Sequence, residues 1–197
     1  DLKSIDVQFN ADDPHFKEAI SSVPRLLSLI DRNPVSKSFG SFDRSYWLEK
    51  SIDFPSANLQ FGVLALSLLY KINYNNSFYY KNPIILKWIE AAINFWGKCQ
   101  HNDGSFDEFY PNERGWGAPT GFTCYAISYS LYLLGDNLPE YLILKTKNSL
   151  IQGIKFLNKY TGDKMLANHH AISILAINAL SNVVVDKIHL SDLENKI

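Results

Sequence analysis

The chain has few of the residues that mark several common classes of protein. Only two of its 197 residues are cysteine, Cys99 and Cys124, which is too few for a disulfide scaffold and lacks metal-ligand spacing. We expect two buried thiols. No stretch is long and apolar enough to span a bilayer, and the 19 basic residues, balanced by 20 acidic ones, form no basic run. A membrane and a nucleic acid are therefore both disfavoured as partners. No secretory signal is visible at Asp1, and the compartment stays open.

The chain does have helical periodicity, because apolar residues recur at spacings of three and four while alternating patterns are scarce. The fold class is therefore predicted to be all-α. The pattern predicts a first helix with Asp13 as its N-cap and a kink near Pro24. A capping box at Ser191 and Glu194 predicts that a further helix starts there. The predicted helices cover residues 14–29, 56–72, 82–100, 119–134, 139–159 and 167–180.

The predicted helices alternate between two kinds. Those over 56–72, 119–134 and 167–180 are apolar on all sides and are expected to be surrounded by protein, whereas 82–100 and 139–159 are amphipathic. This alternation predicts helical hairpins with an inner and an outer layer, as in a partial α/α toroid forming one domain over 1–197. An irregular helical bundle is the alternative. Three inner helices close only part of a ring, so we expect the chain to be truncated after Ile197 or completed by another part.

In such a layout the inner helices run the same way, so the segments before them meet at one end. Long loops are expected at 33–55 and 101–118, and the opposite end has no comparable set of ionisable groups. We therefore predict one polar site. Its candidate residues are Arg44, Trp47, Asn58 and Gln60 from the first segment, Asp107, Glu108, Tyr110, Asn112, Glu113, Arg114 and Trp116 from the second, and Asn168, His169 and His170 from the third.

Each part of this predicted site has a purely structural alternative. The residues from Asp103 to Phe106 have the form of a tight turn, and the acidic residues after them suit a solvated loop. The loop aromatics suit anchoring to the core, and Asn168 suits a helix cap. A sugar-binding site, however, needs aromatic faces beside carboxylates and arginine. No metal or other cofactor is expected, because adjacent histidines point ~100° apart on a helix and no ligand follows at i+4.

Three runs of sequence resemble one family. These are GSFDRSYWLEKSIDFPSANLQFGVLAL, DGSFDEFYPNERGW and NHHAISILAINAL, within residues 38–182. They are similar to the toroid domain of heparinase II/III-like and alginate-lyase-like proteins, which are bacterial polysaccharide lyases and their relatives. DGSF turns also occur in terpene-cyclase-like and prenyltransferase-like toroids.

The resemblance implies β-elimination on a polysaccharide that contains uronic acid. Removing the C5 proton requires that the neighbouring carboxylate be neutralised and that a base and an acid be present. By resemblance, Asn168 is the neutraliser and His169 a neutraliser or base. His170 is not assigned by the resemblance, and we expect it to be structural or to support these two residues from behind. The family's tyrosine acid is expected one hairpin later, beyond Ile197, and no part of the given sequence is expected to form the family's β-sandwich domain.

Two other functions remain open at this point. One is a non-catalytic module that binds carbohydrate or acts as a scaffold. The other is an isoprenoid-binding toroid, for which Asp103, Asp107 and Glu108 would be the acidic cluster.

Overall fold

A computed structural model describes residues 2–5, 7–75, 77–160 and 166–184, and in these ranges the regular structure is helical, as the sequence predicts. The predicted helix start at Ser191 lies outside the described residues. The elements in chain order are α1 (Pro14–Ser21), α2 (Val23–Leu29), α3 (Arg44–Trp47), the 3₁₀ helix η1 (Ala57–Phe61), α4 (Gly62–Lys71), α5 (Pro83–Cys99), α6 (Gly117–Leu134), the 3₁₀ helix η2 (Gly135–Asn137), α7 (Glu140–Tyr160) and α8 (Ala167–Ser181).

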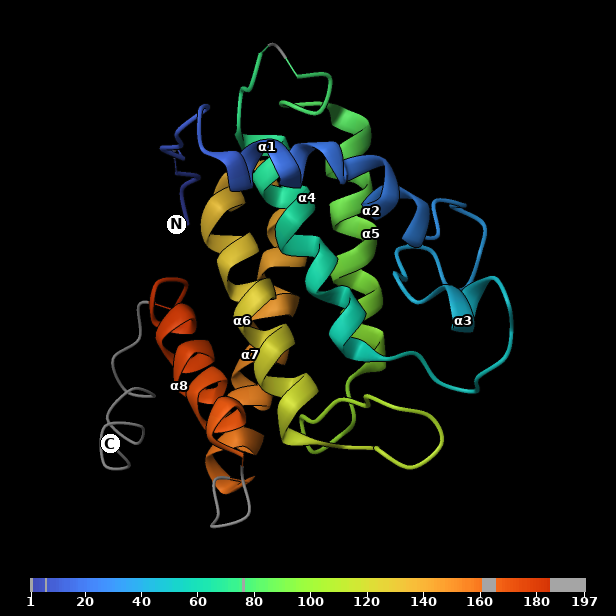
Figure 1. The fold of residues 1–197 in the computed structure, drawn as a ribbon. Helices are drawn as coiled ribbons and strands as arrows, with labels where there is room; N and C mark the ends of the chain where they lie inside the picture. The colour runs from blue at the N-terminus through green and yellow to red at the C-terminus, as the bar shows by residue number, and fades with distance from the viewer. Residues whose placement is uncertain (1, 6, 76, 161–165, 185–197) are drawn as a thin grey trace.

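The long helices form antiparallel hairpins in two layers. Helices α4, α6 and α8 lie side by side and run in the same direction, and α5 and α7 run the opposite way behind them (Figure 1). Helices α1 and α2 lie across α4 and α5 near the end where α4 finishes (Figure 1). The segments that lead into α4, α6 and α8 consequently lie at the other end of the molecule.

Helix α6 is the centre of the core, with fourteen of its eighteen residues buried. Small residues let its neighbours approach closely. A Cβ atom added to Gly153 of α7 would lie only 2.5 Å from the Cys124 sulfur of α6. Such tight contact increases the dispersion energy of the interface. The sequence prediction of a helix buried nearly all round is therefore correct for α6.

The outer helices α5 and α7 are amphipathic, as predicted. Helix α5 begins after Asn82, whose side chain accepts a hydrogen bond from the Ile84 amide at 2.8 Å, and Pro83 occupies its first turn. Helix α7 buries Leu142, Leu150 and Ile154, and most of its lysines are exposed, because an amphipathic helix turns its apolar stripe toward the core.

Two local predictions are wrong. The single helix expected over 14–29 is two helices, separated at Ser22, with Pro24 in the first turn of α2. Proline lacks an amide hydrogen and its ring clashes with the carbonyl four residues earlier, so a break replaces the expected kink. The loop expected over 33–55 contains the short helix α3, because the Asp43 carboxylate caps it by accepting from the Ser45 amide at 3.1 Å.

Two inner helices are less enclosed than the sequence predicts. Phe61, the last residue of η1 before α4, is 38% exposed. In α8, Ile174 and Leu175 are 39% and 47% exposed. Helix α8 packs with Ile172 and Ala176 against its neighbours and leaves the opposite stripe open. An apolar sequence therefore does not mean here that every side of the helix is covered.

In the described ranges, no helix combines the length and hydropathy that a bilayer crossing needs. Both cysteines are free thiols, Cys124 being buried and Cys99 half-buried. Burial, together with the charge of Asp107, raises the pKa of Cys99 to about 12, so this thiol is not a reactive thiolate at neutral pH.

Candidate functional site

Three polar segments, distant in sequence, meet at the end where α4, α6 and α8 begin (Figure 1). The Asn58 amide donates to a Glu108 carboxylate oxygen at 2.5 Å, and the Ala57 amide donates to the Asp107 carbonyl at 2.9 Å. The Trp116 and His169 rings form a T-shaped contact, with centroids 5.2 Å apart and planes at 85°. These contacts join the segment before α4 to the 101–116 loop, and that loop to the start of α8.

The 101–116 loop is anchored in the core by Phe106. This side chain is fully buried and stacks on Trp96 with ring centroids 4.8 Å apart. Its carbonyl accepts from the Trp116 amide at 2.9 Å, so the loop closes on itself. The predicted tight turn is present: Gly104 has φ +95°, and an Asp103 carboxylate oxygen accepts from the Ser105 amide at 3.0 Å. The loop is therefore a fixed platform for the polar residues that it carries.

Asp107 is buried, with 7% of its surface exposed, and both of its carboxylate oxygens form hydrogen bonds within this loop. One carboxylate oxygen lies 2.7 Å from the His101 Nε2 atom and accepts from the Gly115 amide at 2.8 Å. The other accepts from Arg114 at 3.3 Å. A carboxylate that orients an imidazole in this way is the arrangement that supports a general base. His101, which the sequence analysis leaves out of its candidates, is thus chemically the best-prepared histidine.

Glu108 is also buried, at 8% exposed, but its contacts are incomplete. Three buried oxygen atoms here accept no hydrogen bond from the described residues: one carboxylate oxygen of Glu108, the side-chain oxygen of Asn58 and one carboxylate oxygen of Glu113. Burial and the nearby Glu113 charge raise the pKa of Glu108, while the Asn58 hydrogen bond opposes the rise. This corner of the site therefore favours a bound proton more than an exposed carboxylate would.

The outer part of the loop joins aromatic rings to charge. The Arg114 guanidinium lies 4.6 Å from the centroid of the Phe54 ring, and Phe54 in turn contacts Tyr110 with centroids 5.4 Å apart. The Tyr110 hydroxyl donates to Asp53 at 3.1 Å, and the hydrogen bond and the Asp53 charge raise the pKa of that phenol. Arg114 and Tyr110 remain exposed, so they are available to a ligand.

The three residues at the start of α8 point in different directions, as ~100° per residue requires. His169 is half-buried against Trp116, whereas Asn168 and His170 are exposed. Asn168 does not cap α8: the position before the helix is Leu166, and no side-chain cap is formed there. The structural alternative for Asn168, a helix cap, is therefore wrong, and its amide is open to solvent.

The remaining candidates divide into residues that build the fold and residues that face outward. Gln60 is 2% exposed, and its amide group donates to the Gly40 and Ala92 carbonyls and accepts from the Phe42 amide. The prediction that Gln60 binds a ligand is therefore wrong, because its side-chain amide is fully used by these backbone groups. The Trp47 indole donates to the Leu29 carbonyl at 2.8 Å, Arg44 is half-buried, and Asn112 is exposed.

Sequence reasoning misses a stripe of aromatic side chains on α6. Tyr125 contacts Tyr129, with ring centroids 4.9 Å apart, and stacks on Phe61 at 6.3 Å. Tyr129 is 36% exposed, and Phe122 and Tyr132 are half-buried. Their spacing of three and four residues places them on one face, and that spacing is the signal that a helical wheel of this segment contains.

No metal cluster is found among the described residues: nowhere in those ranges do three His, Cys, Asp or Glu side chains come together as ligands. No family model, curated protein or solved structure matches the chain. The site is therefore interpreted from its own geometry.

Proposed function

We propose that this chain is a carbohydrate-active domain that binds an acidic, uronic-acid-containing oligosaccharide at the end where α4, α6 and α8 begin. The hairpins would form part of an α/α toroid. One observation carries the proposal: Asn58, Glu108, Trp116 and His169, from three separate segments, are joined there by direct contacts. Folding three distant polar segments together costs conformational entropy, and a ligand site explains why they carry such side chains.

The chemistry of the exposed groups suits a sugar. The apolar faces of Tyr110 and Trp116 can stack on a pyranose ring, and the Arg114 guanidinium can form paired hydrogen bonds with a uronate carboxylate. The exposed amide of Asn168 offers both a donor and an acceptor for hydroxyl groups. The aromatic stripe on α6 would extend the stacking surface along the inner layer.

The reaction proposed for this site is β-elimination. Asn168 would neutralise the uronate carboxylate, which lowers the barrier to removing the C5 proton. His169 would assist as neutraliser or base, and His101, held by Asp107 on the loop that also carries Trp116, would be a second candidate base. Proton delivery to the leaving oxygen needs an acid in addition to these groups.

The first prediction tests binding and cleavage together. Acidic oligosaccharides such as oligoalginate and heparan fragments are titrated into the protein by calorimetry, and absorbance of unsaturated uronate is followed. The Asn168→Ala, His169→Ala double variant is expected to lose cleavage by about a hundredfold or more. Asn178→Ala and His15→Ala, at exposed positions away from the site, should leave both measurements unchanged. Cleavage retained in the double variant contradicts the catalytic assignment.

A non-catalytic carbohydrate-binding module is the second candidate, and one observation favours it. Tyr110, the tyrosine of the 101–116 loop, donates its hydroxyl hydrogen to Asp53 at 3.1 Å, so in this conformation it does not offer that proton to a leaving oxygen. For such a module we expect saturable sugar binding without product, weakened by Arg114→Ala or Trp116→Ala and unaffected by His169→Ala. Failure of every acidic sugar to bind would contradict both candidates.

A further inference from the structure

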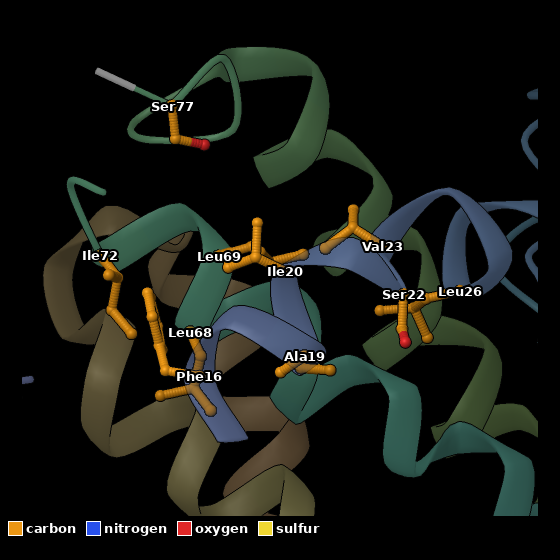
Figure 2. Close-up of a pocket in the computed structure, with 11 residues that line it drawn as sticks. Phe16, Ala19, Ile20, Ser22, Val23, Leu26, Leu68, Leu69, Ile72 and Ser77 are labelled. Carbon is orange, nitrogen blue, oxygen red and sulfur yellow. The ribbon is translucent and has the colours of Figure 1, made fainter. Parts of the chain in front are cut away.

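An apolar cavity lies between α4 and the two helices that cross it, α1 and α2. Its volume is about 350 Å³. Figure 2 shows side chains from these three helices facing a common space, with Ser77 on the loop that follows α4. The cavity is thus bounded by elements that do not contribute to the polar segments described above.

Among the described residues that line this cavity, no side chain is charged, and most are apolar. Phe16 and Ile20 of α1, Leu26 of α2, and Leu68 and Ile72 of α4 supply most of the wall. Ser22 and Ser77 are the only described lining residues that have a polar side chain. A carboxylate or an ammonium group buried here would have no partner and would be strongly disfavoured. The wall therefore selects a neutral, largely apolar occupant with at most a small hydroxyl-like head.

Helix α1 covers one side of the cavity, but its side chains do not fill the cavity. None of its residues is buried. Its Phe16 ring is instead held from the side, by Phe9 at 5.0 Å and Tyr74 at 5.1 Å between ring centroids. Protein interiors are close-packed, with few voids larger than a water molecule. An unfilled apolar cavity of this size next to an apolar helix therefore indicates a binding site for a ligand.

We propose that this cavity binds a neutral single-chain lipid, with the chain between α1 and α4 and a hydroxyl head near Ser22 or Ser77. A methylene group occupies about the volume of a water molecule, ~30 Å³, so 350 Å³ accommodates on the order of a dozen carbon atoms. The inference is independent of the proposed sugar site, since no lining residue belongs to that site.

The test uses 1-dodecanol as probe, measured by displacement of Nile red from the protein. Saturable binding is expected, and alcohols from eight to twelve carbons should gain roughly three- to fourfold in affinity per methylene. Dodecanoate and dodecyltrimethylammonium should bind at least tenfold more weakly, because the wall has no opposite charge. Equal binding of the three probes, or no saturation with dodecanol, would overturn the proposal.

Two variants locate the bound chain. Ala65→Phe, in the cavity wall, should weaken dodecanol binding at least tenfold, whereas Ala171→Phe, on the exposed face of α8, should not. Leu68→Ala enlarges the space and should move the preferred chain length upward by about three carbons, a gain of function that misfolding does not mimic. Binding unchanged in Ala65→Phe, or a dimer that this substitution dissociates, would show that the cavity is not a lipid site.

Discussion

At the residue scale, the polar end of the molecule contains side chains of two kinds. Asp107 and Gln60 use their polar atoms on the protein itself, and they fix the loops around them. Arg114, Tyr110 and Asn168 present polar atoms to solvent. Substitutions of the first kind should therefore act through stability, and those of the second kind through binding.

Glu108 gives a prediction about pH. Its pKa is raised in the native state, so the folded protein holds this proton more tightly than the unfolded chain does. Its contribution to stability is present below the ordinary pKa of a glutamate and is lost as pH rises through the higher native pKa. We expect Glu108→Gln to remove this loss, so that the variant gains stability relative to wild type as the pH rises from 4 to 7.

Thermal unfolding followed across this pH range measures the difference between the two proteins. Glu18→Gln, at an exposed position of α1, is the matched control and should run parallel to wild type. A Glu108→Gln variant whose melting temperature also stays parallel to wild type would mean that the buried carboxyl is already fully solvated or paired.

At the element scale, turns and caps decide how the helices are joined. The turn at 103–106 docks on α7 through Gly104, where an added Cβ atom would overlap the carbonyl of Gln152. The same turn starts the loop that carries Asp107 and Glu108 into the site. Helix packing and site geometry are therefore linked through one glycine with a positive φ.

This link predicts a large effect of Gly104→Ala. The substitution combines a strained left-handed backbone with a clash against α7, and we expect the free energy of unfolding to fall by about 2 kcal/mol or more. Gly97→Ala in α5 is the control, because the nearest atom to its Cβ is the Ser149 hydroxyl at 3.9 Å. That substitution should be neutral or stabilise by up to ~1 kcal/mol. Urea unfolding of both variants gives the comparison; equal midpoints would contradict the docking of the turn.

At the scale of the whole molecule, the inner layer is covered unevenly. Helix α6 is enclosed by α4, α7 and α8, whereas α8 packs on one stripe only. Its other stripe holds Ile174 and Leu175 in contact with solvent. An isolated apolar stripe of this size is tolerated on a protein surface.

Because this stripe of α8 is exposed to solvent, we expect it to tolerate charged side chains. Ile174→Lys combined with Leu175→Lys should change the free energy of unfolding by less than about 0.5 kcal/mol each, as is usual for surface positions. Ile172→Lys, at a position 7% exposed, should cost about 3 kcal/mol or prevent folding, because it buries an unpaired ammonium group. Denaturant titration with light scattering tests this; strong destabilisation by the double variant would mean that another part of the protein covers the stripe in solution.

The sequence by itself determined the helical class, the alternation of hairpins and most helix boundaries. These depend on local periodicity, proline and capping residues such as Asn82, which act within a few positions along the chain. The order of the helices also predicted which polar segments lie near the beginning of each inner helix. The break at Ser22 was harder to predict, because Pro24 suits both a kink and the first turn of a new helix.

Only the tertiary structure decided which polar residues are saturated and which are open. The sequence does not distinguish Gln60, whose amide serves three backbone groups, from Asn168, whose amide faces solvent, since the difference lies in partners up to 32 residues away. The sequence alone also did not lead us to the His101–Asp107 pair, the aromatic stripe on α6 or the cavity between α1 and α4. Periodicity reports which side of a helix is apolar, but the packing of distant elements determines whether that side is covered.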